Sequence, residues 1–229
     1  MIFNRDFREN DIPDRSVDLV LTDIPYEIGE NAYASSKYWY DDEKRRTAFF
    51  ETDAEPFDIP SYIAEAARII KDRGAVFTFC AFEQIPRLLE EGKRRGLKKC
   101  LPFVAVKKTS PDVLKCNIRT CRFFECAVLQ WRNKLPYFNA TGYQQTNVLQ
   151  FVKGPEAVIH PTQKPVGMLE EIIRRYTPPD GVVVDFCAGS GSTVIAALRL
   201  GRQGVGFEIN PEFYRKAQEW LASDDIQHF

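Results

Sequence analysis

The chain has 229 residues, 44% hydrophobic and 13% aromatic, with a formal net charge of −1 at pH 7. This length and composition fit one globular domain with a large core, spanning residues 1–229, and exclude general disorder. No apolar run reaches membrane-spanning length and the first residues read as a strand, so we expect no membrane partner, no signal peptide and a cytoplasmic location.

The cysteine pattern argues against both disulfides and a metal. Six cysteines are present but none forms a C-x-x-C pair, and only two histidines exist. Cys116, Cys121 and Cys126 recur every fifth residue, which is not a usual zinc-ligand spacing. We therefore expect reduced thiols and no bound metal.

The N-terminal half predicts strands alternating with helices. Met1–Phe7 reads as a short strand ending at Asp6, and Ser16–Thr22 as a stronger strand that runs straight into the next motif. Further along, the pattern predicts the helix capped by Ser61 and closed by Gly74, the strand Ala75–Phe79, the helix Glu83–Arg95, and a hairpin of Leu101–Val106 with Phe123–Trp131.

The tetrapeptide Asp23-Ile24-Pro25-Tyr26 is the candidate catalytic motif. At the carboxyl end of a parallel strand, Asp23 would face the crevice where such sheets bind ligands. Pro25 biases Ile24 toward an extended conformation that projects its carbonyl group outward, and Tyr26 offers a ring for stacking. Together these groups suit an exocyclic amino group on a planar base, although a plain strand-to-loop turn gives the same local pattern.

Two segments lack a clear period, and one of them is basic. Glu27–Pro60 is rich in aromatic and charged residues, which favours a long functional loop or lid. Arg87–Arg122 carries eleven Lys/Arg against three acids. The part around Lys93–Lys99 reads as a solvated helix face. The remaining basic side chains predict a surface for a polyanion, and they are Lys107, Lys108, Lys115, Arg119 and Arg122.

The C-terminal part begins with Asn133–Lys153, which is polar and irregular. Pro165 suits the first position of the following helix. Gly181–Asn210 then predicts one βαβ unit: the β-branched run Val182–Val184 ends at Asp185, a glycine turn opens a helix, and a second strand delivers Glu208. A final helix starts at Pro211 behind the cap Asn210.

The glycine turn indicates which cofactor this unit holds. Gly191 is followed by Ser and Thr rather than Lys, which argues against a phosphate-cradling loop, and Val194 stands where a dinucleotide fingerprint needs its third glycine. A carboxylate, Asp185, precedes the glycines and suits a sulfonium or ammonium cation, while Glu208 can accept from ribose hydroxyls. The interpretation is S-adenosylmethionine; the alternative is an ordinary βαβ unit whose glycines only make a tight turn.

Three motifs now stand in a specific order: DIPY (23–26), HPTQKP (160–165) and DFCAGSGST (185–193). In this order they resemble the β class of S-adenosylmethionine-dependent amino methyltransferases that modify DNA bases, over nearly the whole chain. The resemblance implies a doubly wound, Rossmann-like α/β fold with a mostly parallel, seven-stranded sheet. It also implies one reversed strand and a circular permutation that starts the chain beside its own last strand.

The resemblance also implies roles for individual residues. The target amino group would lie against Asp23, Ile24, Pro25 and Tyr26. The methionine side of the cofactor would lie against Asp185, Ala188, Gly189 and Gly191, its ribose against Glu208, its adenine amino group against Asp6 and its carboxylate near Thr162 and Lys164. For Thr162 and Lys164, helix capping and a surface cation remain the alternative.

The implied reaction transfers a methyl group to a base flipped out of double-stranded DNA. Asp23 favours adenine N6; the alternatives are cytosine N4 and a catalytically inactive, DNA-binding homologue. A protein-glutamine methyltransferase is disfavoured because its cofactor loop comes first. Three departures from the family stand out: Ile24 replaces a proline, Phe186-Cys187 replaces Pro-Phe, and the target-recognition segment 133–153 is short. Sequence readout could then fall to 27–60, to 107–122, or to the second subunit of a homodimer.

Overall fold

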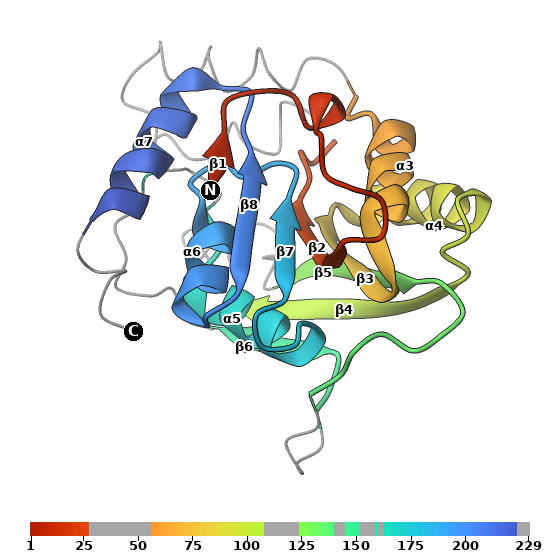
Figure 1. Ribbon diagram of the computed structural model, residues 1–229. Coiled ribbons are helices and arrows are strands. Elements are labelled where there is room, and N and C mark those ends of the chain that lie inside the picture. The colour runs from red at the N-terminus through yellow and green to blue at the C-terminus, as the bar shows by residue number, and fades with distance from the viewer. Residues whose placement is uncertain (28–55, 108–123, 140–144, 152–158, 160–162, 224–229) are drawn as a thin grey trace, which may run out of the picture.

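The computed structural model describes residues 1–27, 56–107, 124–139, 145–151, 159 and 163–223. Within these residues, eight strands form one sheet in the order β1-β8-β7-β2-β3-β5-β4-β6 (Figure 1). The strands are β1 (Ile2–Phe3), β2 (Val17–Asp23), β3 (Ile70–Cys80), β4 (Lys99–Lys107), β5 (Phe124–Trp131), β6 (Val148–Phe151), β7 (Val182–Asp185) and β8 (Gln203–Phe207).

The strand directions match the expected permuted, mostly parallel sheet. β5 pairs antiparallel with both β3 and β4, while the other pairings are parallel, so β5 is the one reversed strand of the described sheet. The first strand, β1, pairs with the last, β8. The described sheet has eight strands, one more than the expected seven. β6 lies in the segment 133–153 that the sequence predicts as irregular, and four parallel pairings to β4 make it a strand.

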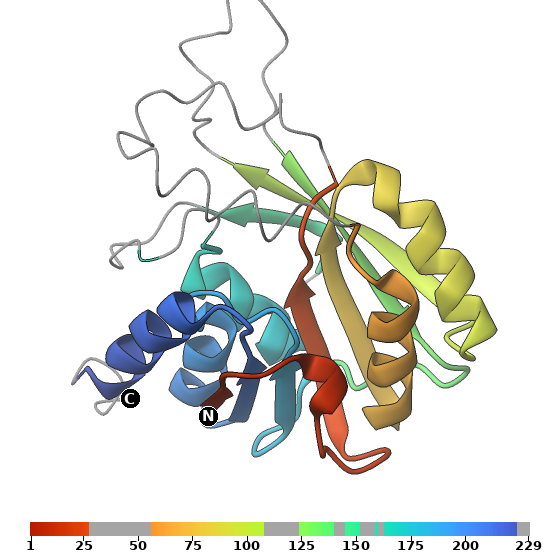
Figure 2. The same ribbon diagram turned by 90° about the horizontal axis from the view of Figure 1, so that it is seen from above.

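Helices cover both faces of the sheet. In Figure 2, α3 and α4 lie on one side and α5, α6 and α7 on the other, which is the doubly wound arrangement. The α-helices of the described residues are α3 (Ile59–Ile69), α4 (Ile85–Arg94), α5 (Val166–Tyr176), α6 (Ser192–Arg199) and α7 (Pro211–Ala222). Two short 3-10 turns, η1 (Phe7–Glu9) and η2 (Phe82–Gln84), precede β2 and α4.

Each face of the sheet has its own apolar core. Successive residues of β2 divide between the two: Leu19 and Leu21 pack with α5 and α6, whereas Val20 between them packs with α3 and α4. Since strand side chains alternate between faces, a strand covered on both sides must be apolar throughout. This explains the apolar runs Leu19–Leu21 in β2, Ala75–Phe77 in β3 and Val182–Val184 in β7.

Two helix starts differ from the sequence prediction. The cap of α3 is Asp58, whose carboxylate accepts from the Ser61 N–H at 3.0 Å, rather than Ser61 itself. Pro60 has no N–H to satisfy, so it fits the first turn. At α5, Pro165 has extended backbone angles and is the cap, so the helix begins one residue later. α3 also ends at Ile69 rather than near Gly74, because β3 takes over the chain from Ile70.

Some expectations fall on residues outside the described part of the chain. Of the predicted insertion 27–60, residues 28–55 are not described, and its last two residues already belong to α3. Among the described residues, no helix is long and apolar enough to cross a membrane. The proposal that 1–229 form one methyltransferase domain stays a prediction.

Candidate active site

Three predicted acidic residues gather at the carboxyl edge of the central strands. Asp23 is the last residue of β2, Asp185 is the last of β7, and Glu208 follows β8 directly. β2 and β8 both flank β7, so the three carboxylates come from adjacent strands. Parallel strands end at the same edge, seen at the arrowheads of β7 and β8 in Figure 1. The sheet therefore brings together groups up to 185 residues apart in the sequence (208 − 23).

The Asp185 carboxylate is buried at the base of the glycine turn. Its Oδ1 accepts from the Cys187 N–H at 3.0 Å. Burial raises its pKa from the usual 3.8 to about 7; hydrogen bonds from Thr193, Cys187 and Thr22 oppose this rise, and the negative charge of Asp23 adds to it. A carboxylate held this way gains from a nearby cation, because a cation compensates the lost hydration.

The glycine turn has the backbone that only glycine adopts without strain. Gly189 and Gly191 have φ values of 51° and 83°, in the left-handed region. A Cβ atom added to Gly191 would lie 2.8 Å from Ile2 Cδ1 and 3.3 Å from Ala217 Cβ. Gly191 is thus required by its conformation and by the packing of β1 and α7 against it.

Glu208 connects the end of β8 to the glycine turn. Its two carboxylate oxygens accept from the backbone N–H groups of Gly189, at 2.7 Å, and Asn210, at 2.8 Å. Burial raises the pKa of Glu208, and these backbone hydrogen bonds lower it in part. Each carboxylate oxygen can accept two hydrogen bonds, so Glu208 can fix the loop and still accept from a hydroxyl.

The loop residue after Asp185 belongs to the core. Phe186 is 3% exposed and stacks on Phe7 with ring centroids 5.0 Å apart. Tyr62 meets the Phe186 ring edge-on, at 6.0 Å. The aromatic ring at this altered family position therefore packs between the sheet and η1.

Asp6 follows β1, which is parallel to β8, so it lies toward the same carboxyl edge of the sheet. Its carboxylate already has a hydrogen-bonding partner. It accepts from the Arg8 backbone N–H at 2.8 Å and pairs with the Arg8 guanidinium at 2.6 Å. The side-chain hydrogen bond from Arg8 lowers the pKa of Asp6. Its expected contact with an adenine amino group stays a prediction.

The catalytic motif contains one buried acceptor oxygen that no described residue hydrogen-bonds. Asp23 Oδ2 pairs with the Lys164 ammonium, while Asp23 Oδ1 is buried and has no hydrogen-bond partner within the described residues. The Ile24 N–H donates to the Phe79 carbonyl at 3.2 Å, and Gln84 Nε2 donates to the Pro25 carbonyl at 2.9 Å. These two hydrogen bonds fix the turn after β2, in which Ile24 stands at the position of a family proline.

Lys164 lies at the catalytic motif. Its side chain is 8% exposed, and its ammonium contacts Asp23 and lies 3.1 Å from Glu125 Oε2 and 3.5 Å from the Tyr26 hydroxyl. Burial lowers the pKa of Lys164, but the two carboxylates outweigh this effect and keep the group protonated. Sequence reasoning expected Lys164 beside the cofactor carboxylate. The structure brings it to the aspartate of the motif, and its expected place near the cofactor carboxylate stays a prediction.

Glu125 is a member of this cluster that sequence reasoning missed. It stands near the start of β5, in the otherwise apolar run FFECAVL (123–129). An acidic residue in a mostly apolar strand indicates a buried ion pair or hydrogen bond, because a buried charge needs a partner. Sequence alone does not say that the partner is Lys164.

Several predicted site residues lie outside the described part of the chain. They are Thr162 and four of the basic residues, Lys108, Lys115, Arg119 and Arg122. The backbone of Lys107 belongs to β4, where it pairs with Phe151. Within the described residues, no group of three or more His, Cys, Asp or Glu side chains could hold a metal ion.

Comparisons with known proteins find DNA methyltransferases. A family model described as "DNA methylase", covering N6 and N4 methyltransferases, matches residues 145–219. The putative methylase YubD of Escherichia coli K12 is 27% identical over 92% of this chain and 84% of its own length. The type II methyltransferase M.HpaI of Haemophilus parainfluenzae is 24% identical over 93% of this chain and 70% of its own.

Solved structures share the fold. The M1.HpyAVI–SAM complex superposes with a TM-score of 0.69, at 23% identity over 91% of this chain and 90% of that one. The cytosine-N4-specific PvuII DNA methyltransferase gives a TM-score of 0.73, at 19% identity over 98% and 86%. The fold is thus the Rossmann-like fold of these methyltransferases. In sequence the chain is similar to DNA methyltransferases of the N6 and N4 amino-methylating kind, and its matched relatives and solved neighbours include S-adenosylmethionine-dependent enzymes.

Proposed function

We propose that this protein methylates the exocyclic amino group of a base flipped out of double-stranded DNA, and that the base is adenine, modified at N6. The observation that carries the proposal is the unshared, buried Oδ1 of Asp23 beside an oxygen already held by Lys164. An acceptor kept dry and without a partner is set up for an N–H donor that arrives with the substrate.

The residues of the carboxyl edge fit a cationic cofactor. Asp185 supplies a buried carboxylate, and Ala188, Gly189 and Gly191 form the turn against it. A negatively charged cradle suits the sulfonium and ammonium groups of S-adenosylmethionine and disfavours a pyrophosphate. Glu208 retains acceptor capacity for a ribose hydroxyl. S-adenosylmethionine, when bound, supplies the electrophilic methyl group.

The catalytic motif acts on the target nitrogen. Asp23 Oδ1 and the Ile24 carbonyl accept the two N–H bonds of the amino group, and Pro25 keeps that carbonyl projected. Both hydrogen bonds raise electron density on the nitrogen and fix the direction of its lone pair. Tyr26 stacks on the flipped base, which compensates for the stacking lost from the duplex.

Adenine is favoured over cytosine by the aspartate in the first position of the motif, as the family resemblance implies. Among the relatives, the DNA adenine methyltransferase YhdJ of Escherichia coli is 26% identical over 89% of this chain. Cytosine N4 is the second candidate, since the PvuII enzyme, named for that activity, shares the fold.

One experiment tests the reaction and the base together. The protein is incubated with S-adenosylmethionine labelled in its methyl group and unmethylated duplex DNA, which is then digested to nucleosides. We expect the label in N6-methyldeoxyadenosine. Label in N4-methyldeoxycytidine would replace adenine by cytosine, and unlabelled DNA at any enzyme concentration would contradict the proposed function.

A further inference from the structure

The buried charges around Asp23 form a set of three, and only two of them have a role so far. Lys164 precedes α5, Asp23 ends β2, and Glu125 comes from β5, which is two strands away from β2 in the sheet. The side chains of Glu125 and Asp23 are 16% and 22% exposed. Two carboxylates thus share one ammonium in a largely dry site.

The hydrogen-bonding capacity of the ammonium makes the arrangement specific. An ammonium has three donors and no acceptor. In this site the ammonium donates to Asp23 Oδ2, forms an ion pair with Glu125 Oε2 at an N···O distance of 3.1 Å, and lies 3.5 Å from the Tyr26 hydroxyl. Lys164 is therefore held by Asp23 Oδ2 and Glu125, and Asp23 Oδ1 is not among its hydrogen-bond partners.

We propose that Glu125 is a positioning residue for methyl transfer, which holds the Lys164 ammonium on one oxygen of Asp23 so that the other oxygen stays free for the target amino group. This inference rests on the proposed function. Without Glu125, the ammonium has one carboxylate partner instead of two and a flexible stem. It would then share its donors between both oxygens of Asp23 and occupy the acceptor that the substrate needs.

Glu125 also affects the charge on Asp23. Burial raises the pKa of Asp23, Lys164 lowers it and Glu125 raises it. The other ionisable groups near Asp23 are Tyr26, Cys80, Asp185 and Cys187, whose pKa values are all raised by burial and by the charge of Asp23. Of the described neighbours, Glu125 is the carboxylate that shares a counterion with Asp23. Its loss should make Asp23 easier to ionise but a weaker acceptor.

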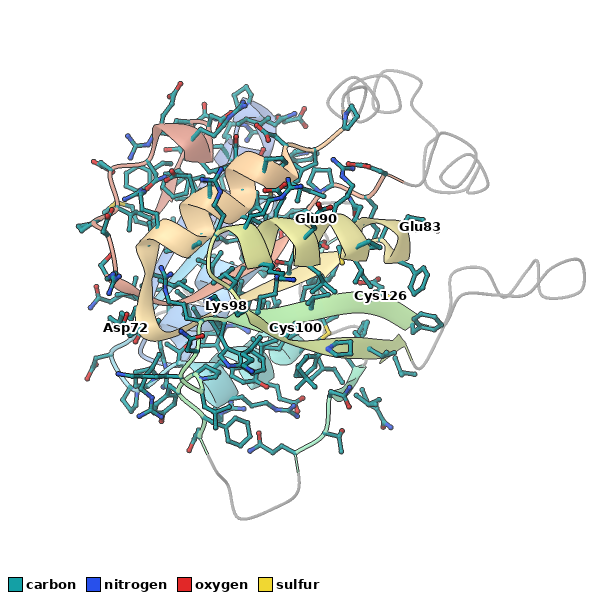
Figure 3. The ribbon with its side chains drawn as sticks, turned by 90° about the vertical axis from the view of Figure 1, so that its right-hand side faces the viewer. Asp72, Glu83, Glu90, Lys98, Cys100 and Cys126 are labelled. Carbon is teal, nitrogen blue, oxygen red and sulfur yellow. The ribbon has the colours of Figure 1, made fainter. Side chains whose placement is uncertain are left out.

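The test compares Glu125→Gln with Glu83→Gln. Glu83 is exposed and lies at the same end of the molecule as Cys126, the neighbour of Glu125 in β5 (Figure 3), so it controls for a lost negative charge. Single-turnover methyl transfer is measured from pH 5 to pH 9. We expect Glu125→Gln to lower the rate about tenfold or more, to move the acid limb to lower pH, and to leave S-adenosylmethionine affinity unchanged. We expect Glu83→Gln to match wild type.

A thermal-unfolding cycle separates this inference from the proposed function. We expect Lys164→Met to lower the melting temperature strongly, because it leaves two buried carboxylates without a cation. Adding Glu125→Gln to that variant should restore part of the loss. Circular dichroism checks each fold. If Glu125→Gln does not fold, Glu125→Asp, which keeps the charge and shortens its reach, is assayed instead, with the same loss of rate expected.

The outcomes are distinct. Wild type that methylates DNA together with a Glu125 variant of unchanged rate and acid limb would overturn the positioning role and leave the proposed function standing. If the melting-temperature changes of Lys164→Met and Glu125→Gln simply add in the double variant, Lys164 and Glu125 do not interact, and the inference is likewise overturned. If the wild-type protein transfers no methyl group but the melting losses are still non-additive, the proposed function is contradicted. The role of Glu125 in methyl transfer is then contradicted too, although the ion pair itself remains.

Discussion

The Glu208 side chain accepts a hydrogen bond from the backbone N–H of Gly189 at 2.7 Å. The residue that follows β8 therefore fixes the loop that follows β7. A second bond, from the Asn210 N–H at 2.8 Å, uses the other carboxylate oxygen. One acidic side chain thus joins the glycine turn to the start of α7.

Replacement of Glu208 by Gln should weaken this connection. An amide has one acceptor oxygen, so one of the two backbone N–H groups would face an NH₂ group and lose its partner. We expect Glu208→Gln to lower S-adenosylmethionine affinity about tenfold or more and to lower the melting temperature. The matched control is Glu212→Gln on the exposed face of α7, for which calorimetry should find wild-type affinity. Equal affinities for the two variants would show that the carboxylate of Glu208 is not needed.

Asp185 should make cofactor binding depend on pH. Its pKa is raised to about 7 by burial, so it is largely protonated at pH 6 and ionised at pH 8. A cationic ligand prefers the ionised form. We expect S-adenosylmethionine affinity to rise about tenfold from pH 6 to pH 8, and Asp185→Asn to bind weakly with little pH dependence. A wild-type affinity that is constant across this range would contradict the assignment.

The same group should affect stability in the opposite direction. The folded protein keeps a proton on Asp185 that the unfolded chain, with a pKa of 3.8, has released. Its contribution to the free energy of unfolding is present below about pH 4 and is lost as the pH rises through about 7. We expect urea titrations to show a smaller decrease of stability between pH 5 and pH 7.5 in Asp185→Asn than in wild type.

Gly191 should tolerate alanine less well than Gly201. Both residues have positive φ, 83° and 69°, but a Cβ on Gly201 would meet no atom within 4 Å. We expect Gly201→Ala to lower the free energy of unfolding by about 1 kcal/mol, the cost of the backbone conformation. Gly191→Ala adds the close contact with Ile2 and should cost on the order of 2–3 kcal/mol. Equal losses in urea titrations would mean that Ile2 moves aside freely.

Asp23 and Tyr26 should differ in which step they support. Loss of an acceptor in a dry site costs on the order of 3 kcal/mol of barrier, so we expect Asp23→Ala to lose about a hundredfold or more in methyl transfer with normal cofactor affinity. Tyr26→Ala should lose rate and DNA affinity together, on the order of 1–3 kcal/mol. A mismatch at the target base lowers the cost of flipping and should restore Tyr26→Ala in part, but not Asp23→Ala. Near-normal turnover in Asp23→Ala would mean that Asp23 is not the catalytic acceptor and that another site carries the reaction.

The basic segment should control the salt dependence of DNA binding. Each lysine or arginine that neutralises a phosphate releases counterions and steepens the fall of affinity with salt. We expect the combined alanine substitution of Lys107, Lys108, Lys115, Arg119 and Arg122 to flatten that slope, as measured by fluorescence anisotropy from 50 to 200 mM salt. An unchanged slope would mean that these side chains form only a solvated surface.

The sequence by itself determined the βαβ unit that holds the glycine turn. Strand β7, the glycine turn and strand β8 each follow from residues close together in the chain, since a β-branched run, a positive-φ glycine and a second apolar run depend on local sterics and burial. The predicted ends of three strands also indicated that Asp23, Asp185 and Glu208 face one crevice, because parallel strands end at one edge of the sheet. The helix starts at Ile59 and Val166 fell within a few residues of their predictions.

The tertiary structure alone decided which side chains meet. β6 is a strand because it pairs with the edge of β4, and its own four residues are too few to predict a strand. Lys164 reaches Asp23 across 141 positions of sequence, and Glu125 holds it there from a third element. Local pattern cannot foresee such a contact, because a buried ammonium is placed by the carboxylates that compensate its lost hydration, and these come together only when the sheet and α5 have packed.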